Sequence, residues 1–177
     1  MTPPPGPPSG LPIGAPSGAP TAPTAALREE YAVPMRRALA LASVAAENGD
    51  VPVGAVVLDP DGVVLGEGWN LREVEGDPTA HAEVVALRAA ARHTGSWRLE
   101  DCTLVVTLEP CPMCAGAAML ARIGRIVLGA WDPKLGATGS VWDVVRDRRA
   151  THRIEVIGGV LEDEASRVLL DFFEDRR

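Results

Sequence analysis

Two cysteines lie in a motif whose spacing could hold a metal ion. Cys111 and Cys114 are three residues apart in Pro110-Cys111-Pro112-Met113-Cys114, where an apolar strand is expected to end and a helix to begin. Unpaired backbone amides and the positive end of the helix dipole lower the pKa of thiols at such a junction, so thiolates form readily. Because thiolates bind zinc, the motif predicts a zinc site; a redox-active thiol pair is the alternative.

A second motif, His81-Ala82-Glu83, opens a helix upstream of the cysteines. Residues two apart lie about 200° from each other around a regular helix, so both side chains reach one site only from its first turn. Taken alone, His-x-Glu is typical of an exposed surface. Beside the thiol pair, it supplies an imidazole ligand and a carboxylate that need not bind the metal.

The two motifs together supply three protein ligands for zinc, which are His81, Cys111 and Cys114. Structural zinc sites use four protein ligands, whereas catalytic sites leave one position to water. We favour an open, catalytic site because each possible fourth ligand has a simpler interpretation: Cys102 in the core, His93 at a helix end and His152 on a basic surface.

An open zinc site beside a carboxylate predicts hydrolytic chemistry. Zinc lowers the pKa of its bound water toward about 7, which makes hydroxide available at neutral pH. Glu83 would take the proton of this water, deliver it to a ring nitrogen as the amine-bearing carbon is attacked, and protonate the departing ammonia. The predicted reaction is the hydrolytic deamination of a nucleobase.

The elements that must position these residues follow from hydrophobic periodicity. A first helix is expected through Met35 and Ala46, with Pro34 in its first turn, and strands at 53–58 and 63–68 flank the turn 59–62 as a hairpin. A strand, a helix and a second strand then require parallel pairing. The sequence predicts an α/β fold, with further elements at 81–93 (helix), 103–108 (strand), 110–121 (helix), 125–130 (strand), 154–157 (strand) and 161–173 (helix).

The composition divides the chain into a tail and one domain. Residues 1–26 contain nine Pro, four Gly and no charged residue, which predicts a disordered, dispensable tail; a polyproline ligand is the alternative. Residues 27–177 are expected to form the folded domain.

No apolar run approaches the roughly 20 residues of a membrane helix. Because residues 1–10 also lack the basic and apolar stretches of a secretion signal, we expect a cytoplasmic protein. Its three cysteines do not make a disulfide framework.

Four segments, in order, resemble the bacterial tRNA-specific adenosine deaminases, the TadA group of the zinc-dependent cytidine deaminase-like superfamily. The resemblance runs from about Glu30 to Arg177. It implies a three-layer fold with a mixed central sheet of about five strands, and conversion of adenosine to inosine at the wobble position of tRNA by a homodimer with one Zn²⁺ per subunit. The matching segments are 51–56 (VPVGAV), 66–70 (GEGWN), 77–83 (DPTAHAE) and 107–117 (TLEPCPMCAGA).

The resemblance also implies roles for individual residues. His81, Cys111 and Cys114 match the zinc ligands, and Glu83 matches the proton-transfer residue. The residues expected to contact the substrate are Asn70 and Ala82 at the target nucleoside, and Asp132, Arg153 and Phe173 near the anticodon arm of the tRNA.

The charge distribution allows an RNA partner despite the net charge of −7. Residues 119–153 carry seven Lys or Arg against three acids, and the rest of the chain sums to −11. This basic segment is expected to contact phosphates. The acidic end at Glu174-Asp175 departs from relatives with a basic extension and predicts weaker or more salt-sensitive RNA binding.

Two other functions stay open: a deaminase of free guanine- or cytosine-type bases or nucleosides, and a non-catalytic zinc-stapled RNA-binding module.

Overall fold

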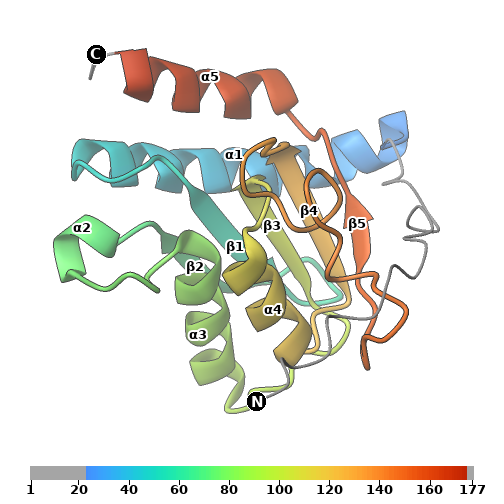
Figure 1. Ribbon diagram of the computed structural model, residues 1–177. Coiled ribbons are helices and arrows are strands. Elements are labelled where there is room, and N and C mark those ends of the chain that lie inside the picture. The colour runs from blue at the N-terminus through green and yellow to red at the C-terminus, as the bar shows by residue number, and fades with distance from the viewer. Residues whose placement is uncertain (1–22, 175–177) are drawn as a thin grey trace, which may run out of the picture.

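A computed structural model describes residues 23–174, in which helices cover both faces of a five-stranded sheet (Figure 1). The expected tail, residues 1–26, lies outside the described residues except for its last four. The helices are α1 (Ala25–Glu47), α2 (Arg72–Glu75), α3 (Ala82–Thr94), α4 (Pro112–Leu120) and α5 (Glu162–Glu174). The strands are β1 (Gly54–Leu58), β2 (Val64–Trp69), β3 (Thr103–Leu108), β4 (Arg125–Ala130) and β5 (Glu155–Ile157).

The sheet has the order β2-β1-β3-β4-β5. Strand β1 is antiparallel to both β2 and β3, while β3, β4 and β5 are parallel to one another. The predicted mixed sheet of about five strands and the α/β class are therefore confirmed. Because β3 and β4 are parallel, the segments that follow Leu108 and Ala130 leave the sheet at the same end.

Alternating side chains of the central strands divide the core into two layers. Val56, Val105 and Val127 pack with buried residues of α1 and α5 on one face. Leu104 and Ile126 pack with α3 and α4 on the other. This is the three-layer arrangement expected from the family resemblance, and it places α3 and α4 side by side on one face (Figure 1).

Two glycines of β2 bring α3 close to the edge of the sheet. A Cβ atom at Gly66 would lie 2.4 Å from the Ala90 nitrogen, and one at Gly68 would lie 2.4 Å from the Ala82 oxygen. Any larger residue would push the helix away from the strand. The small residues therefore fix where the first turn of α3, with His81 and Glu83, meets the sheet.

The described elements differ from expectation at two places. Helix α1 begins at Ala25, capped by Thr24, whose hydroxyl accepts a hydrogen bond from the Leu27 amide at 3.2 Å. Pro34 is therefore inside the helix rather than in its first turn, and one backbone hydrogen bond is missing there. The four-residue helix α2 was not expected; it ends at Gly76, which has a φ of 61°.

None of the described helices is long and apolar enough to cross a membrane.

Candidate metal centre and active site

The N-terminal ends of α3 and α4 bring three ligand atoms together. The Nδ1 atom of His81 lies 3.8 Å from the Sγ atom of Cys111 and 3.5 Å from that of Cys114. The two sulfurs are 3.6 Å apart. Among residues 23–174, this is the one group of three or more His, Cys, Asp or Glu side chains whose donor atoms could share a metal ion.

The spacing of these atoms fits tetrahedral zinc. With Zn–S bonds of about 2.3 Å and Zn–N bonds of about 2.0–2.1 Å, two sulfurs would be about 3.8 Å apart and a sulfur and a nitrogen about 3.5 Å apart. The observed separations lie within 0.3 Å of these values. One imidazole and two thiols also form a donor set that zinc prefers. The residues present therefore fit the cation.

Local helix geometry explains why the three ligands converge. His81 and Cys111 are the N-cap residues of α3 and α4, with extended backbones at φ −74° and −70°. Pro112 occupies the first turn of α4, where a missing amide costs nothing, and places Cys114 within the same turn as Cys111. Each cap residue thus projects its side chain off the helix end instead of along its flank.

The pKa values of the two thiols in the cluster are shifted in opposite directions, and one thiol is already in the deprotonated state that a metal ligand needs. The hydrogen bond between the two sulfurs, together with nearby His81, lowers the pKa of Cys111 to about 4. The same hydrogen bond, with burial, raises the pKa of Cys114. Cys111 is therefore a thiolate at neutral pH, and a divalent cation would take the place of the proton that Cys114 retains.

Glu83 is the buried carboxyl beside the ligands. Only 3% of it is exposed, and burial raises its pKa to about 7. The pKa of Glu83 responds to the charges of Cys111 and His81, so its carboxyl lies near the ligand cluster. A carboxyl with a pKa near neutrality can both accept and donate a proton under physiological conditions, as general acid-base catalysis requires.

Asn70 links the end of β2 to the first turn of α3. Its Oδ1 atom accepts a hydrogen bond from the Ala82 amide at 3.0 Å, and its Nδ2 group donates one to the Val51 carbonyl at 3.0 Å. The side chain of Ala82 is fully buried. Asn70 therefore holds the segment with His81 and Glu83 in place, and one hydrogen of its amide nitrogen stays available for a ligand.

Comparison with known proteins identifies the family. A sequence profile for the cytidine and deoxycytidylate deaminase zinc-binding region matches residues 28–130. The tRNA-specific adenosine deaminase of Haemophilus influenzae is 51% identical over 143 residues, which cover 81% of this chain and 83% of the relative. The chain belongs to the tRNA-specific adenosine deaminase family.

Two further comparisons place this deaminase among larger and solved relatives. A solved structure from a study of A-to-I editing by tRNA:A34 deaminases at the wobble position superposes with a TM-score of 0.75 at 40% identity, covering 77% of this chain and 99% of that one. A tRNA(Ile)-lysidine synthase of Deinococcus radiodurans is 55% identical over 143 residues, 81% of this chain. That match covers only 24% of the synthase, so this deaminase corresponds to a part of the longer protein.

The three residues expected near the anticodon arm lie at different places relative to the metal cluster. Asp132 follows β4 at the same end of the sheet as Cys111, and its amide donates to a buried carboxyl. Arg153 precedes β5, which is parallel to β4, and therefore lies at the opposite end of the sheet. Phe173 is half-exposed on α5, in the helix layer of the other face, with its ring against Phe172.

Part of the expected basic surface is neutralised within the chain. The guanidinium of Arg146 lies 2.8 Å from a carboxylate oxygen of Asp143, and that of Arg149 lies 2.7 Å from Asp147, whose pKa it lowers. These pairs reduce the positive charge that the segment offers to phosphates.

None of the possible fourth ligands joins the cluster. Cys102 is buried directly before β3, at the end of the strand away from Cys111, and burial raises the pKa of its thiol. A ring nitrogen of His152 lies 2.6 Å from the Ile123 carbonyl oxygen. His93 is exposed in the last turn of α3. The preference for three protein ligands therefore stays consistent with the described residues.

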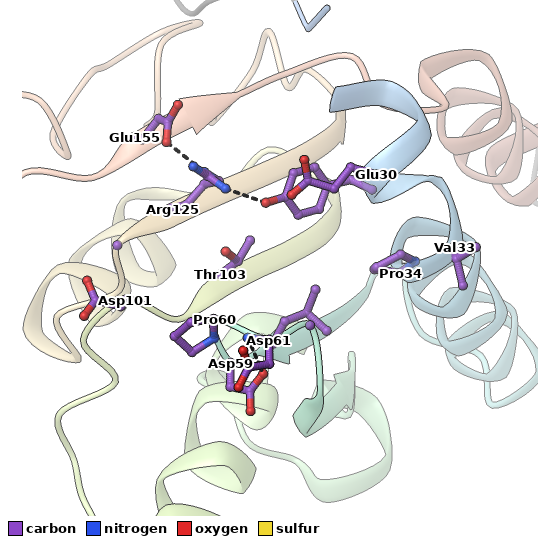
Figure 2. Close-up of a pocket in the computed structure, with 14 residues that line it drawn as sticks. Glu30, Val33, Pro34, Asp59, Pro60, Asp61, Asp101, Thr103, Arg125 and Glu155 are labelled. Atoms are coloured by element: carbon purple, nitrogen blue, oxygen red, sulfur yellow. Dashed lines mark hydrogen bonds and ion pairs between the residues drawn. The ribbon is translucent and has the colours of Figure 1, made fainter. Parts of the chain in front are cut away.

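A cavity of about 650 Å³ lies at the far end of the sheet from the metal cluster. The guanidinium of Arg125 lies there, 2.5 Å from the hydroxyl oxygen of Tyr31 and 2.7 Å from a carboxylate oxygen of Glu155. Figure 2 labels Arg125 and Glu155 in this cavity. One arginine faces several acids, so the cavity repels phosphates. Its acidic lining residues are Glu30, Asp59, Asp61, Asp101 and Glu155.

Two buried carboxylates that position the site were not identified from the sequence. Asp50, 1% exposed, accepts hydrogen bonds from the amides of Val51 and Glu73 and so fixes the loop next to Asn70. Glu109, 2% exposed, directly precedes Pro110 and Cys111. The available signal was an acid beside the metal motif, at the end of a strand whose residues are mostly apolar.

Proposed function

We propose that this protein deaminates adenosine to inosine at the wobble position of tRNA, with one Zn²⁺ per chain held by His81, Cys111 and Cys114. The observation that carries the proposal is the buried carboxyl of Glu83 beside three ligand atoms that fit zinc. Residues 27–177 would form the deaminase domain. Membership of the tRNA-specific adenosine deaminase family supports the choice of substrate.

The proposed mechanism assigns proton transfer to Glu83. When bound, zinc would supply an acidified water molecule as the nucleophile. Glu83 would accept a proton from the attacking water and pass it to a ring nitrogen, while a C–O bond forms at the amine-bearing carbon. It would then protonate the amine as the C–N bond breaks, so that water and adenosine become inosine and ammonia. Asn70 would orient the target nucleoside at the start of α3.

The test of this function is a direct assay on RNA. Zinc-loaded protein is incubated with an anticodon stem-loop that carries adenosine at the wobble position, and inosine is measured by mass. We expect conversion of this RNA and none of a stem-loop that carries guanosine there. Because the pocket must recognise the loop around the base, a stem-loop with its adenosine moved out of the wobble position should also stay unmodified.

The same assay separates the alternatives. Ammonia release from free guanine, cytosine or adenosine, with no turnover of the stem-loop, would replace the proposal by a deaminase of free bases or nucleosides. Zinc and RNA binding without any turnover would instead indicate a non-catalytic RNA-binding module. We expect neither result.

We also propose that the protein is a homodimer through α4. This helix contains no charged or polar side chain other than Cys114, yet its outer face is exposed, with Leu120 at 77%. A helix that is apolar all round is normally buried, so its outer face needs a partner. Exposed apolar residues of α4 and of the segment that follows β4 are Met113, Leu120, Leu135, Val141 and Trp142.

A charge on the outer face of α4 should disrupt this dimer. We expect Leu120→Asp to weaken the dimer at least about tenfold, because it would bury an unpaired carboxylate. The dissociation constant can be measured by analytical ultracentrifugation. Leu170→Asp is the matched control, since Leu170 is also exposed but lies on α5. An unchanged dissociation constant for Leu120→Asp would exclude α4 from the interface.

A cytoplasmic location is proposed on the chemistry of the ligands. All three cysteines are free, and the two at the cluster must stay reduced to bind zinc. A reducing compartment provides that condition, and it is also where tRNA is found.

A further inference from the structure

Glu109 is a buried acid that has no basic partner. It lies between β3 and Cys111, is 2% exposed, and forms no ion pair with any Lys or Arg of residues 23–174. The mechanism proposed above does not use it. A buried carboxylate without a cation must be stabilised by hydrogen bonds, so its donors indicate what it does.

All four hydrogen bonds to the carboxylate of Glu109 come from one segment, residues 131–140, which we call the 131–140 loop. The Oε2 atom of Glu109 accepts from the Asp132 amide at 3.0 Å. The Oε1 atom accepts from the Thr138 amide at 3.0 Å, the Thr138 hydroxyl at 3.2 Å and the Ser140 amide at 3.1 Å. Both ends of the loop are therefore bound to a single side chain.

The backbone of the same loop is bound to the metal-ligand segment. The amide of Ala137 donates to the carbonyl of Pro110, next to Cys111, at 2.9 Å. Gly136 lies so close to Glu109 that a Cβ atom there would be 2.1 Å from Oε2. The carboxylate thus lies inside the loop, and the loop lies against the residues that precede Cys111.

We propose that Glu109 is a positioning residue that holds the 131–140 loop, and with it Asp132, in the conformation that binds RNA. This inference rests on the proposed function for its substrate. An anchored loop is ordered before the RNA arrives, so its ordering does not weaken binding. Loss of the anchor should therefore raise KM and leave the metal and the chemical step in place.

The chain offers a direct measure of loop order, because Lys134 is its only lysine. Endoproteinase Lys-C can therefore cut the protein at a single position, inside the 131–140 loop. Cleavage of a folded protein follows the fraction of time that the segment is open. The rate of appearance of the two fragments reports on the loop without any need for activity.

Glu109→Gln tests the anchor, since the amide cannot accept from all four donors. We expect Lys-C to cleave this variant at least about tenfold faster than the parent, because charge-assisted hydrogen bonds are lost. KM for the stem-loop should rise about tenfold, while kcat changes by less than about threefold. Zinc content should stay at that of the parent. Glu100→Gln, an exposed acid at the other end of the sheet, is the matched control.

Gly136→Ala provides a second test that leaves Glu109 intact. The added methyl group must displace the loop or the carboxylate, so the same rise in cleavage rate and in KM is expected even if Glu109→Gln does not fold. Unchanged cleavage in both variants, faster cleavage with unchanged KM, or loss of zinc from both variants would each overturn the inference. A parent inactive on RNA would contradict the proposed function, whereas the Lys-C rates would still support or contradict the anchor.

Discussion

Cys111→Ala is expected to lose both bound zinc and deaminase activity. Two remaining ligands, His81 and Cys114, cannot hold zinc at a catalytic site that already has only three protein donors. We expect less than about a tenth of the parent's zinc and a fall in rate of at least about 10³-fold, because the metal supplies the nucleophile. Zinc per chain is measured by elemental analysis after gel filtration, and the rate is measured on the stem-loop.

Cys102→Ala is the matched control for this substitution. It removes the same thiol group from a buried position at the other end of β3, so zinc and activity should stay at parental levels. A chelator should lower the Tm of the parent and of Cys102→Ala by on the order of 10 °C, since a tightly bound ligand stabilises the folded state. The chelator should not lower the Tm of Cys111→Ala, which holds no zinc to remove. Full zinc occupancy in Cys111→Ala would refute its assignment as a ligand.

The ligand cluster could be predicted because each ligand lies at a helix start that the sequence itself marks. Proline after Cys111 and the strand before it define where α4 begins, and the segment before His81 does the same for α3. Both helices pack on the same face of the sheet, and their N-cap residues meet at one end of it. The strand bounds 103–108 and 125–130 also agree with the structure, because each strand contains an unbroken run of buried apolar residues, Leu104–Val106 and Ile126–Leu128.

The placement of residues in irregular segments could not be predicted. Arg153 belongs to a basic run, and the run's composition does not indicate at which end of the sheet it lies; only the parallel pairing of β4 and β5 decides that. The ion pair between Arg146 and Asp143 likewise depends on a turn whose form has no periodic signal. Charge counted along a sequence therefore overstates the charge that a surface presents.

Buried acids such as Glu109 and Asp50 were missed because most of their hydrogen-bond donors are backbone amides. Any residue can supply an amide, so no pairing pattern in the sequence points to them. Their role depends on loops that fold around them, as the 131–140 loop does around Glu109. Pro34 was misplaced for a related reason: the capping Thr24 and a run of helix-forming residues extend α1 past a residue that usually begins a helix.

Glu83→Gln is expected to separate catalysis from metal binding. Glutamine fills the same space but cannot exchange a proton, so zinc content should equal that of the parent while the rate falls at least about 100-fold, or about 2.7 kcal/mol in activation free energy. Because burial disfavours the charged form of Glu83, the amide should not lower the Tm. The loss should appear in kcat rather than in KM, since Glu83 acts on the proton and not on the RNA.

Comparison of this variant with Glu100→Gln decides whether the proton transfer belongs to Glu83. Glu100 is exposed, so its substitution should change neither rate nor zinc content. Retained activity in Glu83→Gln would remove Glu83 from the mechanism and leave the metal cluster without its proton carrier. Loss of zinc in that variant would instead make Glu83 part of the metal site, whereas the ligand atoms that the described part of the chain brings within 4.8 Å of one another belong to His81, Cys111 and Cys114. A stable, zinc-loaded and inactive Glu83→Gln is the outcome that a buried carboxyl beside three ligands requires.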